Sequence, residues 1–132
     1  MRCKINARWI SLIVLFALAL SAHADTNDER EVAYLIDFVA NSGAVFVRNG
    51  SKHNAQEAAD HLAMKYRRAG RYAKTADDFI DNLASKSSIT RKPYTIILAD
   101  GTEILSRDWL YSALEAYREQ HTRHSPENPA AP

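Results

Sequence analysis

The sequence predicts a small α+β fold that is mainly helical, with about four helices and one β-hairpin. Two observations predict it. Apolar residues recur at helical spacing in four segments, and two short apolar runs flank the turn signal Asp100-Gly101. Because an isolated hairpin is only marginally stable, its apolar face is expected to pack on the helices. We therefore expect a single α+β domain over residues 25–120, followed by a disordered polar tail over residues 121–132.

The first predicted helix starts after Thr26, which stands three residues before Glu29 as in a capping box. Its apolar stripe falls at positions i, i+3, i+4 and i+7, namely Val32, Leu35, Ile36 and Val39. Ser42-Gly43 is expected to end the helix, because glycine can adopt the left-handed conformation found after helices. Residues 44–47 then form a short β-branched and aromatic run, and Asn49-Gly50 is a strong turn signal.

Two further helices are predicted from the same kind of signal. Asn54 and Glu57 repeat the capping spacing before a helix that Gly70 ends, and Thr75 caps the next helix. Their expected inner faces are Ala55, Ala58, Ala59, Leu62, Tyr66 and Ala69 in the second helix, and Ala76, Phe79, Ile80 and Leu83 in the third.

The last part of the domain is predicted to be the hairpin and a closing helix. A strand over residues 93–98, a two-residue turn at Asp100-Gly101 and a return strand over residues 102–105 form the hairpin. Ser106 is expected to cap the final helix, whose inner face is Trp109, Leu110, Ala113, Leu114 and Tyr117.

The N-terminal segment, residues 1–24, has the order of a secretory signal peptide. A basic start with Arg2, Lys4 and Arg8 precedes a 13-residue apolar and hydroxyl run over residues 9–21, and Ala22-His23-Ala24 forms a small-x-small cleavage site. The run is shorter than the roughly 20 residues that a spanning helix needs. We therefore expect cleavage after Ala24, a periplasmic location and no membrane anchor after cleavage.

The composition narrows the classes of partner. The predicted leader carries three basic residues and no acidic one, so its removal turns a net charge of +1 into −2. A mildly negative chain lacks the concentrated basic face that nucleic-acid binding requires. The single cysteine, Cys3, leaves with the leader, so we expect no disulfide and no thiol nucleophile in the mature protein.

The candidate binding surface gathers polar residues around one turn and one helix flank. On the second helix, a step of 100° per residue places four polar side chains along one flank, those of Glu57, His61, Lys65 and Arg68. Three further features can extend this flank: the turn that carries Arg48 and Asn49, His53 just before the helix, and the hydroxyl-rich segment 85–88. The predicted site residues are Arg48, Asn49, His53, Glu57, His61, Lys65 and Ser87.

Two alternatives for this surface remain open. Glu57 could orient His61 as a general base, which would make the protein a small hydrolase. Alternatively His53, Glu57 and His61 could approach a metal, although two helical turns, about 12 Å, separate the histidines. No serine has the spacing of a hydrolase elbow. We therefore assign no catalytic residue, no metal and no cofactor.

The favoured hypothesis is a non-catalytic binding or interaction module of the cell envelope, with an envelope protein or a small ligand as partner. An enzyme should show Arg48, His53 or His61 converging in a concave pocket around a partly buried histidine with a perturbed pKa. A binding module is expected to spread the same residues over a flat or convex face.

Several motifs in one order resemble the YfeK-like family of small exported bacterial proteins of unknown function. They are FVRNG (46–50), His53, Glu57-Ala58, His61-Leu62, Lys65, TADDFID (75–81), ASKSSIT (84–90) and KPY (92–94). The resemblance implies an exported Gram-negative protein and no particular activity. It also implies glycine before the Lys-Pro-Tyr motif, where this chain has Arg91, so a turn that needs a positive φ would be strained there.

Overall fold

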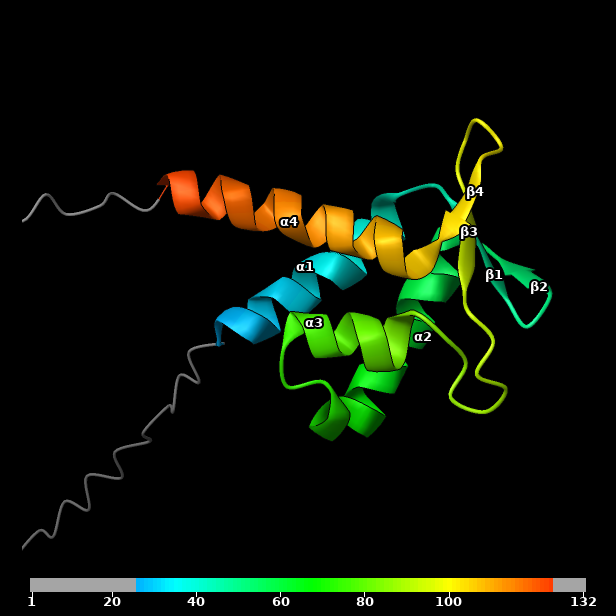
Figure 1. Cartoon of the computed structure of the whole chain (residues 1–132), viewed down its shortest axis with the longest axis horizontal. Helices are drawn as coiled ribbons and strands as arrows, with labels where there is room; N and C mark the ends of the chain where they lie inside the picture. Colours follow the sequence, from blue (N-terminus) through cyan, green and yellow to red (C-terminus); the bar gives the residue numbers. More distant parts are fainter. Residues whose placement is uncertain (1–25, 125–132) are drawn as a thin grey trace, which may run out of the picture.

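Helices cover one side of a four-stranded antiparallel sheet in the computed structural model, which describes residues 26–124 (Figure 1). The main helices are α1 (Asn27–Asn41), α2 (Ala55–Ala69) and α4 (Ser106–His124), with a 3₁₀ turn η1 (Gly70–Tyr72) and the short α3 (Ala76–Asp78) that continues as a π-helix, η2 (Phe79–Ala84). The strands are β1 (Val45–Arg48), β2 (Ser51–His53), β3 (Thr95–Ile97) and β4 (Glu103–Leu105). The predicted α+β class with about four helices is confirmed, while the leader and residues 125–132 lie outside the described range.

Local capping interactions define where three helices begin. Thr26, Asn54 and Thr75 each accept a hydrogen bond from the backbone N–H three residues later, and an acidic side chain at that position accepts from the cap's own N–H. The two predicted capping boxes and the predicted cap at Thr75 are therefore present, and Thr75 also forms a capping box with Asp78. They fix the entry into α1, α2 and α3 through contacts within four residues of chain.

The sheet has the order β2-β1-β3-β4, so it contains two hairpins where the sequence predicted one. In the first hairpin, Asn49 and Gly50 both have positive φ, +49° and +79°, between the paired residues Arg48 and Ser51. This is the pattern of a two-residue type I′ turn. The prediction missed β2, because its residues Ser51, Lys52 and His53 are polar and give no apolar signal.

The second hairpin and α4 differ from the prediction at their ends. The N–H of Leu98 donates to the Thr102 carbonyl, and the Leu98 carbonyl accepts from the N–H of Gly101. These two bonds close a turn of three residues, 99–101, where the sequence predicted a turn of two. Ser106 is the first residue of α4 rather than its cap, and its hydroxyl donates to the Ala84 carbonyl at 3.1 Å. The helix continues through His124, so residues 121–124 are helical where the sequence predicted a disordered tail.

The core lies between α1, α2, η2, α4 and the inner face of β3. Its largest fully buried side chains are Phe79, Leu35, Ile80, Ile96, Leu110 and Leu114. One charged group is buried beside it, the carboxylate of Glu31, which accepts two hydrogen bonds from the guanidinium of Arg118 at 2.9 and 2.7 Å. No helix within residues 26–124 is both long enough and apolar enough to cross a bilayer.

Carbonyl groups of the π-helix η2 accept hydrogen bonds from three side chains. Ser85 Oγ donates to the Ile80 carbonyl, and Lys65 Nζ of α2 donates to the Leu83 carbonyl. Together with the Ser106 bond to Ala84, these contacts hold the end of η2 between α2 and α4. The chain therefore leaves η2 at a fixed place and forms the loop 86–92 beside the β1–β2 turn.

Candidate functional site

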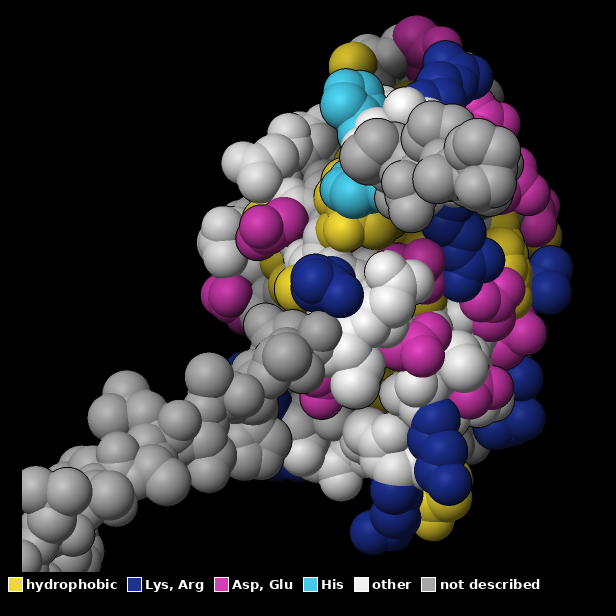
Figure 2. Space-filling view, turned by 90° about the vertical axis from the view of Figure 1, so that its left-hand side faces the viewer, with side chains coloured by type: hydrophobic (Ala, Val, Ile, Leu, Met, Phe, Trp, Pro, Cys, Tyr) yellow, Lys and Arg dark blue, Asp and Glu magenta, His cyan; other side chains and the backbone are white. Residues whose placement is uncertain are grey.

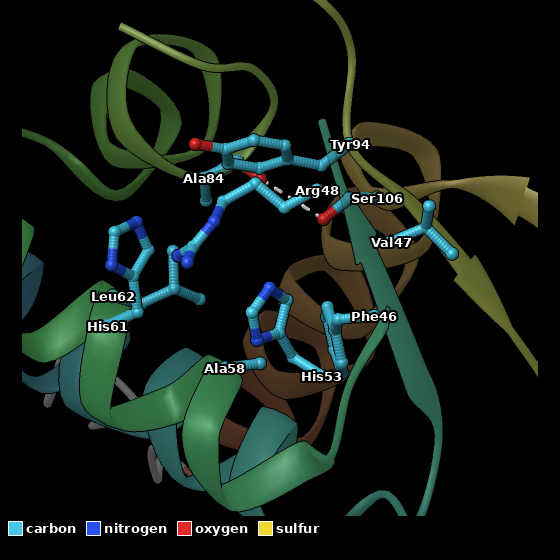
Figure 3. Close-up of a pocket in the computed structure, with 10 residues that line it drawn as sticks. All are labelled: Phe46, Val47, Arg48, His53, Ala58, His61, Leu62, Ala84, Tyr94 and Ser106. Atoms are coloured by element: carbon cyan, nitrogen blue, oxygen red, sulfur yellow. Dashed lines mark hydrogen bonds between the residues drawn. The ribbon is translucent and has the colours of Figure 1, made fainter. Parts of the chain in front are cut away.

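The site begins with the alternation of side chains along β1. Phe46 and Arg48 project toward α2, whereas Val47 projects from the other face of the strand (Figure 3). The side chain of Arg48 runs beneath the ring of Tyr94, and its guanidinium ends between the imidazoles of His61 and His53 (Figure 3). The strand, the helix α2 and the start of β3 thus converge on one point.

Two adjoining hollows meet there. The inner recess has about 20 Å³ open to the centre of a water molecule, and is lined by Phe46, Val47, Arg48, His53, Ala58, His61, Leu62, Ala84, Tyr94 and Ser106. The outer pocket has about 430 Å³, and is lined by Arg48, Asn49, His61, Met64, Lys65, Arg68, Ala69, Ser87, Ser88, Ile89 and Tyr94. Arg48, His61 and Tyr94 belong to both hollows and form the boundary between them.

The wall of the outer pocket carries basic groups and no acidic one. Arg48, Lys65 and Arg68 line it with His61, and none of its eleven lining residues is Asp or Glu. Within residues 26–124, no ion pair engages the Arg48 guanidinium. The face seen in Figure 2 is different, because acidic and basic side chains are intermingled on it. Positive charge is therefore concentrated at the pocket although the domain as a whole is not basic.

The imidazole of His61 is half-buried beside these cations. Burial, and after it the positive charges of Arg48, Lys65 and His53, together lower its pKa to about 4. The imidazole is therefore neutral at pH 7. A neutral imidazole can donate one hydrogen bond and accept another in the pocket.

The ammonium of Lys65 is held at the edge of the outer pocket. It donates to the carbonyls of Leu83 at 2.5 Å and Lys86 at 3.4 Å, and lies 5.3 Å from the centre of the Tyr94 ring. Burial and then the charge of Arg48 lower its pKa to about 8. Lys65 thus has a structural role at the end of η2 and contributes positive charge to the pocket.

Asn49 and Ser87, both predicted as site residues, join the β1–β2 turn to the loop 86–92. Asn49 Nδ2 donates to Ser87 Oγ at 3.5 Å, and Thr90 Oγ1 donates to Asn49 Oδ1 at 2.6 Å. Ser87 Oγ also accepts from the backbone N–H groups of Ile89 and Thr90. Ser87 is buried and organises the loop, which forms one wall of the outer pocket.

Arg91 has the conformation that the resemblance implied. Its φ is +61°, and it is one of two non-glycine residues with positive φ in the described part of the chain. Its N–H donates to the Ser87 carbonyl, which closes the loop on itself. Arginine is less stable than glycine in this left-handed conformation, because its Cβ lies too close to the backbone.

Glu57 does not orient His61, so this part of the prediction is wrong. Its carboxylate accepts the backbone N–H of Asn54 at 3.0 Å and lies 3.8 Å from Nδ1 of His53. Helix capping therefore engages Glu57 at the start of α2, and it lines neither hollow. Among residues 26–124, no three His, Cys, Asp or Glu side chains are grouped closely enough to hold a metal ion.

The remaining predicted residues do meet. Arg48, Asn49, His61, Lys65 and Ser87 line the outer pocket, and His53 lines the inner recess. The expectation that a binding surface would be flat or convex does not hold, because these residues surround a concavity that contains a partly buried histidine of lowered pKa. This arrangement meets the expectation stated for an enzyme, and it is also usual for small-ligand sites. Two further residues line the outer pocket, Arg68 and Tyr94. The helical spacing had placed Arg68 on the same flank of α2 without making it a predicted site residue, and Tyr94 was not predicted.

Comparisons with known proteins agree with the motif resemblance. Residues 26–118 match the model of a family of unknown function, DUF5329. The chain is 40% identical over 88 residues to the uncharacterized protein YfeK of Salmonella typhimurium, an alignment that covers 64% of this chain and 73% of the relative. No solved structure matches the chain significantly. The chain therefore belongs to the DUF5329 family and is similar to YfeK.

Proposed function

We propose that this protein is a small binding module of the cell envelope whose outer pocket holds a small anionic ligand. The observation that carries the proposal is the set of three cationic side chains, Arg48, Lys65 and Arg68, in a concave wall without a carboxylate. Like charges held together and partly desolvated are unfavourable unless an opposite charge joins them. A bound anion supplies that charge.

The electrostatics of the neighbouring groups support the same ligand class. Arg48 lowers the pKa of both His61 and Lys65, so each of these groups is less easily protonated beside the guanidinium. An anion in the pocket would oppose this effect and raise both pKa values. Ligand binding is therefore expected to be coupled to proton uptake by Lys65 near pH 8.

The loop that walls the pocket is already ordered by its own hydrogen bonds. The contacts of Asn49 with Ser87 and Thr90 hold the β1–β2 turn against the loop 86–92. A preformed wall lowers the entropic cost of binding, because little of it must be ordered by the ligand.

The alternative, a small hydrolase with His61 as base, has weaker support. A partly buried histidine of low pKa in a concave pocket is what such an enzyme needs. However, the proposed orienting group, Glu57, is engaged at the helix cap of α2. The binding module is therefore the proposal that the contacts favour.

Export to the periplasm, with cleavage after Ala24, is part of the proposal. Its support is the basic start, the short apolar run and the Ala-x-Ala site. In addition, the first capping box begins at Thr26, two residues after the cleavage site. N-terminal sequencing of the protein from fractionated cells should give Asp25 as first residue. A full-length chain in the inner-membrane fraction would contradict this.

Anion titration tests the binding role. The purified protein is titrated with acetate, phosphate and citrate, and binding is followed by NMR at the His61 ring and the β1 and α2 amides. Arg48→Gln is expected to weaken binding at least tenfold, because a charge-assisted hydrogen bond is lost. Lys52→Gln, on the exposed β2 strand outside both hollows, is the matched control. If no anion shifts these signals, the proposal is wrong.

A pull-down from the periplasm tests whether the partner is an envelope protein instead. Wild type is compared with Arg48→Ala and His61→Ala. A retained protein that both substitutions release would identify a macromolecular partner at this pocket. Unchanged retention of every partner would mean that protein recognition does not use this surface.

A further inference from the structure

We propose that the ligand is a carboxylate whose α-carbon carries an aliphatic group of one or two carbon atoms. The carboxylate lies on Arg48 in the outer pocket, and the aliphatic group occupies the inner recess. This inference rests on the proposed anion-binding function and specifies the chemical class of the ligand.

The inner recess and the outer pocket share a boundary. Because Arg48, His61 and Tyr94 line both hollows, a ligand that contacts Arg48 faces the recess as well as the pocket. Figure 3 shows the guanidinium at this boundary, with Phe46 and Ala58 beyond it. A two-part ligand is therefore matched to two adjoining environments.

The chemistry of the inner recess selects an apolar group. Four apolar residues of its lining, Phe46, Ala58, Leu62 and Ala84, are buried. Arg48, His53, His61 and Tyr94 supply the polar part of the lining. The hydroxyl of Ser106, also in the wall, already donates its proton to the Ala84 carbonyl. Oxygen atoms of a phosphate placed against the apolar walls would lose water without gaining donors, whereas an alkyl group loses nothing.

The size of the recess sets the length of the group. Its open volume of about 20 Å³ compares with the roughly 10–15 Å³ that one water-sized group requires. One or two carbon atoms therefore fill it. The charge is also matched, because the imidazole of His61 is neutral at pH 7 and leaves Arg48 as the cation at the boundary. A carboxylate can accept two parallel hydrogen bonds from that guanidinium.

An NMR titration with a homologous series tests the inference. The full mature protein is titrated with acetate, propionate, butyrate, hexanoate and inorganic phosphate. The dissociation constant is expected to fall about fourfold for each carbon from acetate to butyrate, as for burial of a methylene group, and not to fall further for hexanoate. Phosphate is expected to bind more weakly than butyrate.

Variants tie the effect to the recess. Ala58→Val fills it, so butyrate should bind no better than acetate. Phe46→Leu enlarges the recess, so the affinity should continue to rise for acids longer than butyrate. This second variant tests the role of the recess if Ala58→Val does not fold. Arg48→Gln should weaken every carboxylate at least tenfold. Arg67→Gln, on α2 but outside both hollows, is the charge control and should change nothing.

The source of the carboxylate is resolved by a peptide arm. Gly-Gly-Ala with a free carboxyl group is compared with its amide and with propionate. Tighter binding of the free peptide than of propionate identifies a peptide C-terminus, and weaker binding identifies a free short-chain acid. Both results support the inference, provided that the amide does not bind.

Results of two kinds would contradict the inference: those that overturn the ligand class alone, and one that overturns the proposed function as well. If phosphate binds at Arg48 and chain length has no effect, or if Ala58→Val leaves the chain-length gain intact, the ligand class is wrong while anion binding stands. If no anion in the series binds, both this inference and the proposed function are wrong.

Discussion

The carboxylate of Glu57 accepts the backbone N–H of Asn54 at 3.0 Å, while Asn54 Oδ1 accepts the N–H of Glu57 at 2.9 Å. This reciprocal pair begins α2 and explains why Glu57 is not the partner of His61, although the two residues are one helical turn apart. The position of Lys65 and His61 in the pocket depends on this helix start, whereas the chemistry at His61 does not depend on the charge of Glu57.

Glu57→Gln is expected to leave the titration midpoint of His61 unchanged, because Glu57 is not among the groups that shift that pKa in either direction. Asn54→Ala, by contrast, removes the cap acceptor and should lower the free energy of unfolding by about 1 kcal/mol. NMR titration and urea denaturation measure the two effects. A shift of the His61 midpoint by more than about half a pH unit in Glu57→Gln would restore the base-pair hypothesis.

The His61 imidazole should make stability pH-dependent. Its pKa falls from 6.5 to about 4 on folding, so the unfolded chain binds more protons than the native protein between these values. The stabilisation is complete above pH 6.5 and is lost as the pH falls toward 4. His61→Gln should flatten the stability profile in this window, measured by thermal unfolding at a series of pH values. The same slope in wild type and variant would show that another group causes it.

The Arg118 guanidinium neutralises a buried carboxylate, and its loss should be costly. The Glu31 side chain is 3% exposed and receives two hydrogen bonds from Arg118, which also bonds Asp77 at 2.9 Å. Arg118→Ala leaves Glu31 buried and unpaired, and should destabilise the domain by about 3 kcal/mol. Arg123→Ala breaks an exposed pair with Glu119 and should cost less than about 0.5 kcal/mol. Equal losses in denaturant unfolding would refute this account.

Arg91→Gly should stabilise the protein slightly or leave its stability unchanged. The left-handed φ of +61° costs arginine roughly 1 kcal/mol, and the greater flexibility of glycine in the unfolded chain offsets part of the gain. Arg91→Ala keeps the strain, so the glycine variant should be slightly the more stable of the two. Chemical denaturation of both variants checks this, and an alanine variant of equal or greater stability would argue against strain at this position.

Local signals in the sequence were sufficient to predict the starts of α1, α2 and α3 and the turn between β1 and β2. The capping boxes at Thr26 and Asn54 and the cap at Thr75 were predicted because the partners lie three residues apart, so no distant contact is needed to form them. The turn at Asn49-Gly50 was also predicted, since it requires residues that tolerate positive φ. Such interactions depend on the chain within one turn of the residue concerned.

The tertiary structure decided the rest. The polar strand β2 forms because β1 offers it a partner, and Tyr94 enters the site because β3 pairs with β1. Asn49 and Thr90 meet across 41 residues of chain, and neither sequence spacing nor periodicity reports such a contact. Glu57 could reach His61 by helical spacing, but the unsatisfied N–H of Asn54 at the helix start bound it instead. The sequence by itself determined which groups were available, and the packing of β1, α2 and the loop 86–92 determined which of them share a pocket.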